Sequence, residues 1–280
     1  MLDGWVNQNH DGLPQKAGFP QESINDVHGS WYDPSNPVVK YSGNLKTCLF
    51  NDMENLADTA DLVIVLGTSL GGLNADQCAS KPAARSLKKG SGGSLGTVCI
   101  NLQQTPLDGV MSLRLFGKSD DILKMLLQEL GVEQNEIEEI GNEKLYPKES
   151  RVLVPYDKDG NLLPGGAKNR TDRWMFLDLT KGAEIKLTTG HNCQGAGQPQ
   201  YIHIGRKFDI NEGNGKVKKA GPGNGNVTER VEREGSFRLN IEGAMMHLGI
   251  WWLDVAQRGA IDKLPVVNRN PDMWQAGFGR

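Results

Sequence analysis

The sequence of 280 residues lacks the features that mark metal-binding, disulfide-rich and membrane proteins. No apolar run approaches the ~18 residues of a membrane span, and the first residues lack the basic and apolar regions of a secretory signal. The cysteines are far apart and include no C-x-x-C pair, so neither a zinc knuckle nor a disulfide framework is indicated. They are Cys48, Cys78, Cys99 and Cys193. We therefore expect reduced thiols in an intracellular protein, cytoplasmic or nuclear, without a membrane partner.

The sequence also lacks an excess of charge of one sign. Lysine and arginine together number 31 and aspartate and glutamate 34, which gives a formal net charge of −3. A polyanionic partner would favour a basic excess, so we expect no direct nucleic-acid partner. Glycine is plentiful, at 35 residues, where an average protein of this length would have about 20. This glycine content indicates many tight turns.

The chain is long enough for two domains, since single domains commonly hold roughly 100 to 150 residues. Its first half predicts an α/β fold. Residues 61–67 and 96–102 are short apolar runs rich in β-branched residues, typical of parallel strands covered on both faces. Residues 74–90 predict a helix between these strands, and residues 119–130 predict a second helix capped by Ser119.

The second half shows the two-residue period of antiparallel strands. We therefore place a domain boundary near residue 148, between an α/β domain at 1–148 and a smaller β-rich domain at 149–280. Residues 215–229 are rich in glycine and lysine and predict a mobile loop, whereas residues 244–259 predict one short apolar helix packed on the sheet. The predicted strands are 151–156, 173–179, 183–189 and 200–208.

Polar and small residues follow the two predicted parallel strands. Gly67, Thr68 and Ser69 come directly after the first strand, and Asn101 ends the second. Open parallel sheets bind nucleotides at this edge, and small residues let backbone N–H groups reach an oxygen-rich ligand. An ordinary turn and a strand-capping asparagine are the alternative.

A second polar group lies near the start of the chain. Gln8, Asn9 and Asp11 place three polar side chains within four positions, a set that is costly to bury without a ligand or a network. A solvated loop is the alternative. His28 precedes Gly29, and an imidazole in a cleft suits general-base catalysis at neutral pH, although a lone histidine is more often structural.

Six segments follow one another in a recognisable order: "QNHDGLPQKAG", "HGS", "VVKYSGNL", "DLVIVLGTSL", "INLQQTPLD" and "LRLFGKSDDIL". In this order and spacing, residues 5–130 resemble the sirtuin family of NAD-dependent protein deacylases. The resemblance implies an NAD site made of two sets of residues. The nicotinamide end would lie on Gln8, Asn9 and Asp11. The adenosine half would lie on Gly67, Thr68, Ser69, Asn101 and Leu102, with Ser119 near the adenine.

The same resemblance implies that His28 is the general base. It also implies that Val39 and Tyr41 lie beside an acyl-lysine protein or peptide, which pairs with the backbone as a strand. The expected reaction is NAD-dependent deacylation of lysine, with acyl-ADP-ribose as the second product. Two alternatives stay open: an NAD hydrolase or ADP-ribosyltransferase, and a catalytically inactive scaffold that binds a protein partner.

The sequence departs from the family pattern in two places. The strand, Gly-Ala-Gly loop and Asp-Phe-Arg segment that precede the Gln-Asn motif in the family are not present. We therefore expect an incomplete Rossmann-like sheet in a truncated chain that by itself binds NAD weakly or not at all. The four zinc-binding cysteines that follow the His-Gly motif in the family are not present either, so zinc is not expected.

Overall fold

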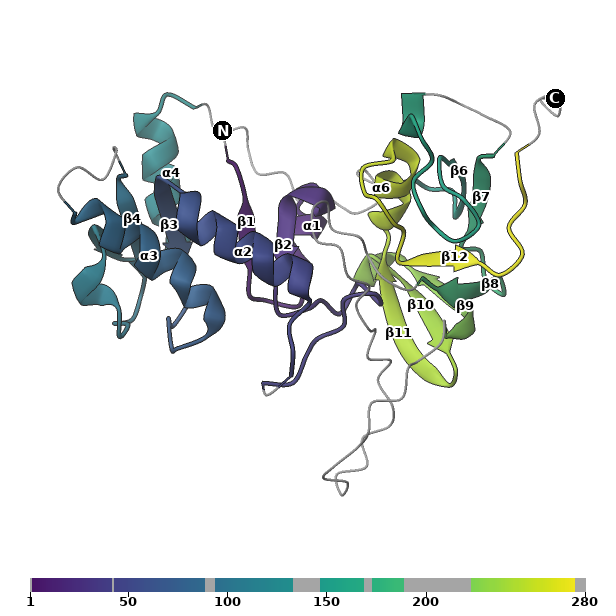
Figure 1. Cartoon of the computed structure of the whole chain (residues 1–280), viewed down its shortest axis with the longest axis horizontal. Helices are drawn as coiled ribbons and strands as arrows, with labels where there is room; N and C mark the ends of the chain where they lie inside the picture. Colours follow the sequence, from purple (N-terminus) through teal and green to yellow (C-terminus); the bar gives the residue numbers. More distant parts are fainter. Residues whose placement is uncertain are drawn as a thin grey trace, which may run out of the picture. The chain divides into compact units, whose positions relative to one another are not determined.

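The computed structural model describes residues 2–41, 43–88, 94–132, 147–168, 173–188 and 223–274. The chain forms two compact units, drawn in Figure 1. The first unit combines Met1–Leu49 with Ile140–Arg280, and the second is Phe50–Glu139. These units are groups of residues in mutual contact and are not the predicted domains. The division into domains at 1–148 and 149–280 therefore stays a prediction.

The second unit holds a three-stranded parallel sheet with the order β3-β4-β5. Helix α3 packs against β3 and β4, and α4 contacts β4. The predicted α/β arrangement with two parallel strands and two helices is confirmed, whereas β5 was not predicted. The elements are β3 (Leu62–Leu66), α3 (Gln77–Ser86), β4 (Gly96–Asn101), β5 (Leu113–Phe116) and α4 (Ser119–Glu129).

One face of β3 differs from the prediction. Val65 is 9% exposed and packs with Ala79 of α3, but Leu62, Ile64 and Leu66 on the other face remain 43–45% exposed. Strand β3 is an edge of its sheet, and the described part of the chain supplies no second strand beside it. The expectation of cover on both faces is therefore wrong for this strand.

Helix α4 begins as predicted, but it is capped differently. Lys118 occupies the N-cap position and makes no side-chain cap hydrogen bond, and Ser119 is the first helical residue. The prediction that Ser119 caps the helix is therefore wrong. Asp120 and Asp121 lie in the first turn, where their negative charge favours the partial positive charge of the helix start.

The first unit begins with a pair of short parallel strands, β1 (Trp5–Asn7) and β2 (Ile24–Asp26). Between them lies α1 (Leu13–Lys16). Helix α2 (Thr47–Thr59) starts in this unit and continues into the second. The short strands position the polar segments that follow each of them.

The rest of the first unit is antiparallel, which confirms the β-rich second half. A five-stranded sheet has the order β11-β10-β9-β8-β12, and β6 pairs with β7. The predicted strands at 151–156, 173–179 and 183–189 correspond to β6, β7 and β8, whereas residues 200–208 lie outside the described residues. The elements are β6 (Arg151–Val154), β7 (Met175–Asp178), β8 (Glu184–Leu187), β9 (Asn224–Val231), β10 (Ser236–Ile241), β11 (Ala244–Gly249), α6 (Trp252–Arg258) and β12 (Val266–Asn268).

Two segments of this half differ from the prediction. Residues 224–229 of the predicted loop belong to β9, and residues 215–222 lie outside the described residues. The predicted helix at 244–259 is instead strand β11 followed by helix α6. A short apolar run suits either element, and pairing with β10 decides in favour of a strand up to Gly249.

The main core lies in this first unit. Phe237, Leu239 and Ile241 of β10 alternate with polar residues and are fully buried, as expected of a strand with one face on a core. Helix α6 contributes Leu253 and Val255 to the same cluster. The antiparallel sheet and α6 therefore share one apolar interior.

The thiols differ in part from the expectation. Cys48 is disulfide-bonded, so the expectation of reduced cysteines is wrong there, whereas Cys78 and Cys99 are free. Burial raises the pKa of Cys78 to about 11 and keeps it a thiol at neutral pH. Of the helices that the structure describes, none has the length and apolarity needed to cross a bilayer.

We predict that Leu239→Ala lowers the free energy of unfolding by about 2–5 kcal/mol, because it leaves a cavity in the centre of the sheet. Urea denaturation would measure the loss. Met245→Ala on the neighbouring strand is the control, since Met245 is 58% exposed and its truncation should cost less than about 0.5 kcal/mol. Equal midpoints for the two variants would contradict the prediction.

Candidate functional site

The predicted site residues fall into two groups, one in each compact unit. The first unit holds the predicted nicotinamide, base and peptide positions: Gln8, Asn9, Asp11, His28, Val39 and Tyr41. The second unit holds the predicted adenosine positions: Gly67, Thr68, Ser69, Asn101, Leu102 and Ser119. Each group is assembled from segments that are distant in sequence.

In the first unit, strands β1 and β2 bring the two polar segments together. The strands are parallel with Asn7 opposite Asp26, so the residues that follow them leave the same end of the pair. Nδ1 of His10 lies 2.8 Å from the carbonyl oxygen of Gly29, and the amide of Trp31 donates to the carbonyl of His10 over 3.0 Å. Residues 8–11 therefore lie against residues 28–31.

The predicted peptide segment lies against His28 because Gly29 permits a tight approach. Gly29 has a φ of +89°, and a Cβ there would come 2.4 Å from the carbonyl oxygen of Pro37. The amide of Val39 donates to the carbonyl of His28 over 3.3 Å. Tyr41, two residues further on, is 90% exposed. A side chain larger than hydrogen at position 29 would force these segments apart.

A buried carboxylate holds the strand ends, and the sequence reasoning did not find it. Asp26 is 4% exposed, and its side chain accepts hydrogen bonds from Asn7 over 2.8 Å and Gln15 over 2.9 Å. Its carbonyl oxygen accepts the amide of Gly29 and the side chain of Asn36, each at 2.9 Å. Burial raises the pKa of Asp26 although these side-chain donors oppose the rise. The available signal was an Asn-Asp pair between Ile24 and Val27.

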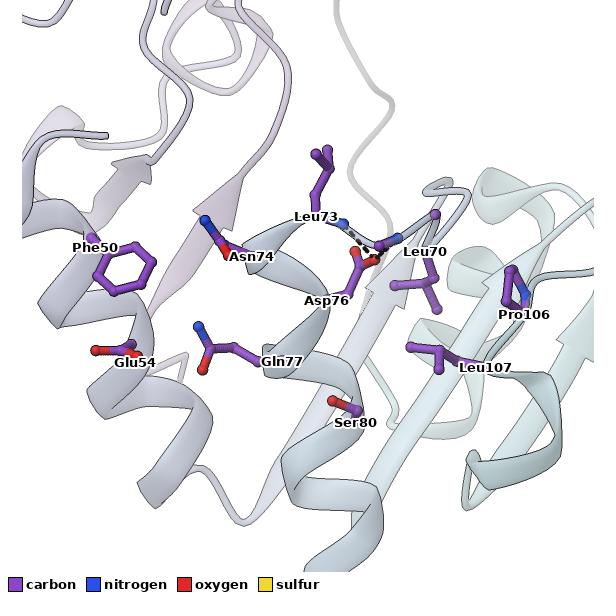
Figure 2. A pocket seen from close by; sticks show the side chains of 12 residues that line it. Phe50, Glu54, Leu70, Leu73, Asn74, Asp76, Gln77, Ser80, Pro106 and Leu107 are labelled. Atoms are coloured by element: carbon purple, nitrogen blue, oxygen red, sulfur yellow. Dashed lines mark hydrogen bonds between the residues drawn. The ribbon is translucent and has the colours of Figure 1, made fainter. Parts of the chain in front are cut away.

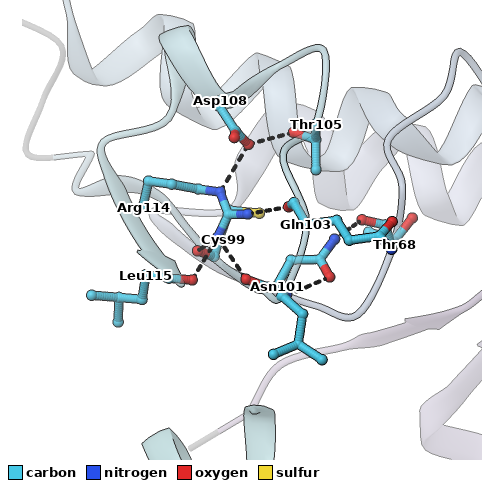
Figure 3. A network of polar contacts seen from close by, with 9 residues as sticks. Thr68, Cys99, Asn101, Gln103, Thr105, Asp108, Arg114 and Leu115 are labelled. Atoms are coloured by element: carbon cyan, nitrogen blue, oxygen red, sulfur yellow. Dashed lines mark hydrogen bonds and ion pairs between the residues drawn. The ribbon is translucent and has the colours of Figure 1, made fainter. Parts of the chain in front are cut away.

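In the second unit, the loops that follow β3 and β4 are joined at the carboxyl edge of the sheet (Figure 3). The side-chain amide of Asn101 donates to the carbonyl of Thr68 over 2.7 Å, and Asn101 Oδ1 accepts the amide of Leu102 over 2.8 Å. The amide of Gly67 donates to the carbonyl of Ile100 over 3.2 Å. Four of the predicted adenosine residues therefore lie within one hydrogen-bonded cluster.

Arg114 donates to main-chain carbonyls in and around this cluster, and it is the second residue that the sequence reasoning missed. Its guanidinium donates to the carbonyls of Cys99 and Asn101, each over 3.2 Å, and to those of Gln103 and Leu115 (Figure 3). Nε also donates to Asp108 over 2.8 Å, and the Arg114 side chain is only 10% exposed. Hydrogen bonds from Thr105 and then Arg114 hold the pKa of Asp108 below its usual value. The available signal was a charged residue within the apolar stretch "LRLF".

A pocket of about 650 Å³ opens beside this cluster (Figure 2). Phe50 and Glu54 of α2 face Gln77 and Ser80 of α3 across it, and it begins at Leu70, one residue after the predicted Ser69. The side chain of Asp76 accepts the amides of Gly72 and Leu73 and thereby shapes its rim. The predicted adenosine residues do not line this pocket.

The expectation that zinc is not bound can be compared with the side chains of the described residues. Across the described ranges, no three His, Cys, Asp or Glu side chains converge in an arrangement that could hold a metal ion. The prediction that zinc is not bound stays open for the chain as a whole.

No protein-family model matches the chain. The NAD-dependent protein deacetylases sirtuin-7 of Bos taurus and of Homo sapiens are each 28% identical to it over 173 residues. These matches cover 46% of this chain and 41% of the relative. This chain is therefore similar to sirtuins over part of its length. It spans about two fifths of the length of the curated relatives it matches.

Solved sirtuin structures also match part of this chain, with low TM-scores and low sequence identity. Sir2Tm bound to a propionylated peptide shares 22% identity with a TM-score of 0.40, over 47% of this chain and 65% of that chain. Sir2 in complex with EX-527, 2'-O-acetyl-ADP-ribose and a deacetylated p53 peptide shares 23% identity, also with a TM-score of 0.40, over 47% and 66%.

For the second unit we predict that Arg114→Lys lowers the free energy of unfolding by about 1–3 kcal/mol, because lysine cannot satisfy four carbonyls and leaves buried acceptors without donors. Chemical denaturation would measure the loss. Arg269→Lys is the control, since Arg269 is 46% exposed in an ion pair of 3.4 Å and should change stability by less than about 1 kcal/mol. A similar small change for both variants would contradict the role of Arg114.

We also predict that protein purified without chelator contains no stoichiometric zinc, because the stretch after His28 and Gly29 lacks the required soft ligands. Elemental analysis measures the metal content. One zinc ion per chain would show that ligands from distant segments converge.

Proposed function

We propose that this chain is an NAD-dependent protein-lysine deacylase of the sirtuin type that acts on acyl-lysine proteins or peptides. One observation carries the proposal: segments 8–11, 28–31 and 36–39 meet at one end of the β1–β2 pair. These are the segments in which the sirtuin resemblance puts the nicotinamide site, the base and the peptide. The curated relatives are themselves named NAD-dependent protein deacetylases, which supports the same reaction class.

The residues present fit a nucleotide. Gly67 has a φ of +62°, and apart from its two chain neighbours no residue has an atom within 4 Å of the position that a Cβ would take, so a ligand can approach its backbone. Asn101 holds Thr68 beside this open space. The adenosine half of NAD would be held by Gly67, Thr68, Ser69, Asn101, Leu102 and Ser119, and the nicotinamide end by Gln8, Asn9 and Asp11.

The proposed roles follow from the chemistry of each side chain. When bound, NAD would supply the ribose carbon to which the acyl oxygen bonds, with nicotinamide as the leaving group. The imidazole of His28 accepts the proton of a ribose hydroxyl, and its backbone is tied to Val39 in the proposed peptide segment. Tyr41, which is almost fully exposed, is available to pack against the peptide.

We predict that His28→Ala reduces deacylation about 100-fold to 10,000-fold while nicotinamide exchange partly survives. The ribose hydroxyl must lose a proton as it bonds carbon, whereas nicotinamide can leave without the base. Mass spectrometry of an acetyl-lysine peptide and release of labelled nicotinamide, both at millimolar NAD, measure the two steps. Asp11→Asn should impair both steps, because Asp11 lies at the proposed nicotinamide end.

His247→Ala is the matched control, because His247 is another partly buried histidine of the same unit that lies outside the proposed site. Its variant should deacylate at the parent rate. Formation of ADP-ribose without acyl-ADP-ribose would replace the proposal with an NAD hydrolase. Absence of nicotinamide release by the parent chain would reject catalysis by this chain and favour the scaffold.

A further inference from the structure

The β-rich half of the chain contacts residues that lie between or directly beside the proposed catalytic segments, within the first unit. Nε1 of Trp251, at the start of α6, donates to Oε1 of Gln21 over 2.9 Å. Nε1 of the next residue, Trp252, donates to the carbonyl of Tyr32 over 3.1 Å. Arg258 of the same helix pairs with Glu22 over 2.6 Å. The contact therefore runs along the whole of α6.

The ring of Trp251 is seated between two glycines. A Cβ on Gly12 would come 3.0 Å from this ring, and a Cβ on Gly249 would come 2.3 Å from it. Gly12 directly follows Asp11 of the proposed nicotinamide end, and it has a φ of +65°. Trp251 is 3% exposed, so the ring is enclosed where it meets the first polar segment.

A chain of hydrogen bonds continues from Trp251 to the strand ends. Gln21 accepts from Trp251 and donates to Oδ2 of Asp26 over 3.4 Å. Gln15, which is fully buried, donates to Gln21 over 3.1 Å and to Asp26 over 2.9 Å. Asp26 also accepts from Asn7. Asn7 directly precedes Gln8, and Asp26 is two residues before His28, so the chain ends beside both proposed catalytic segments.

We propose that the β-rich half is a structural part of the proposed catalytic site and that Trp251 is its positioning residue. The indole orients Gln21, the two glutamines orient Asp26, and Asp26 holds the ends of β1 and β2 in register. Trp251 acts through these residues and does not itself take part in the reaction. The inference rests on the proposed function for its catalytic consequence, whereas the hydrogen-bonded path is a property of the fold.

Trp251→Phe tests the path, and Trp252→Phe is a closely matched control. Both residues are 3% exposed, both variants keep an aromatic ring, and both lose one indole hydrogen bond. Trp251→Phe loses the hydrogen bond to Gln21, which leads to Asp26, whereas Trp252→Phe loses the hydrogen bond to the carbonyl of Tyr32. The two variants should therefore lose similar amounts of global stability in urea.

Local hydrogen exchange should separate them. The amides of Gly29 and Trp31 donate to the carbonyls of Asp26 and His10 and so report on the joined segments. Trp251→Phe should raise their exchange about 5-fold, the equivalent of one ordinary hydrogen bond, and Trp252→Phe less than about 2-fold. Equal changes in both variants, or no change in Trp251→Phe, would overturn the inference.

The pKa of Asp26 gives a second test, because a global loss of stability alone would not change this pKa. Without Trp251, Gln21 is less well oriented toward the carboxylate, so the pKa of Asp26 should rise further in Trp251→Phe. It should be unchanged in Trp252→Phe. Carbon-13 NMR of the side-chain carboxyl would measure it, with the facing carboxylate of Asp33 present in both proteins. The same titration curve in both variants would count against the path.

Gln21→Met provides a second variant if Trp251→Phe folds poorly, because it removes the link and keeps the length of the side chain. It should reproduce the faster exchange. In turnover assays with NAD and acetyl-lysine peptide, Trp251→Phe should lower kcat while Trp252→Phe keeps the parent value. A parent chain without turnover would reject the proposed function and this catalytic consequence, and the exchange data would still decide whether Trp251 holds the segments.

Discussion

The buried carboxylate of Asp26 is the constraint on which the proposed catalytic segments depend. A carboxylate out of water is costly unless donors surround it, and Asn7, Gln15 and Gln21 supply those donors. Each donor comes from a different segment of the chain, so the hydrogen bonds to this one carboxylate fix several segments at once. The main-chain oxygen of the same residue accepts Gly29, which ties the fixed centre to the residue after His28.

In the second unit, one nearly buried side chain again holds several segments, but here the side chain is the positively charged Arg114. The guanidinium of Arg114 is a rigid plane of donors, in which Nη1 and Nη2 meet four main-chain carbonyls and Nε meets Asp108. These carbonyls lie at the ends of β4 and β5 and in the loop between them. The position of Asn101, and through it Thr68, therefore depends on a residue that has no place in the proposed nucleotide contacts.

The two units differ in how completely they bury apolar surface. In the first, a large cluster extends from β6 through the antiparallel sheet to α6. In the second, the buried cluster is small, and β3 leaves Leu62, Ile64 and Leu66 almost half exposed at a sheet edge. Edge strands that expose both apolar side chains and unpaired backbone groups to water are unusual, because other chains can pair with them. The stability of the first unit therefore rests more on packing than that of the second.

By itself, the sequence determined the elements whose signals are local. The β-branched runs predicted β3 and β4, the amphipathic pattern predicted α4, and the ordered motifs showed the resemblance to sirtuins. Only the tertiary structure decided that residues 244–249 form a strand, because that choice depends on pairing with β10. It also decided which groups Asp26, Arg114 and Trp251 contact. Their hydrogen-bond partners lie up to 230 residues away in the sequence, and no local pattern records which distant donor or acceptor a buried polar side chain will meet.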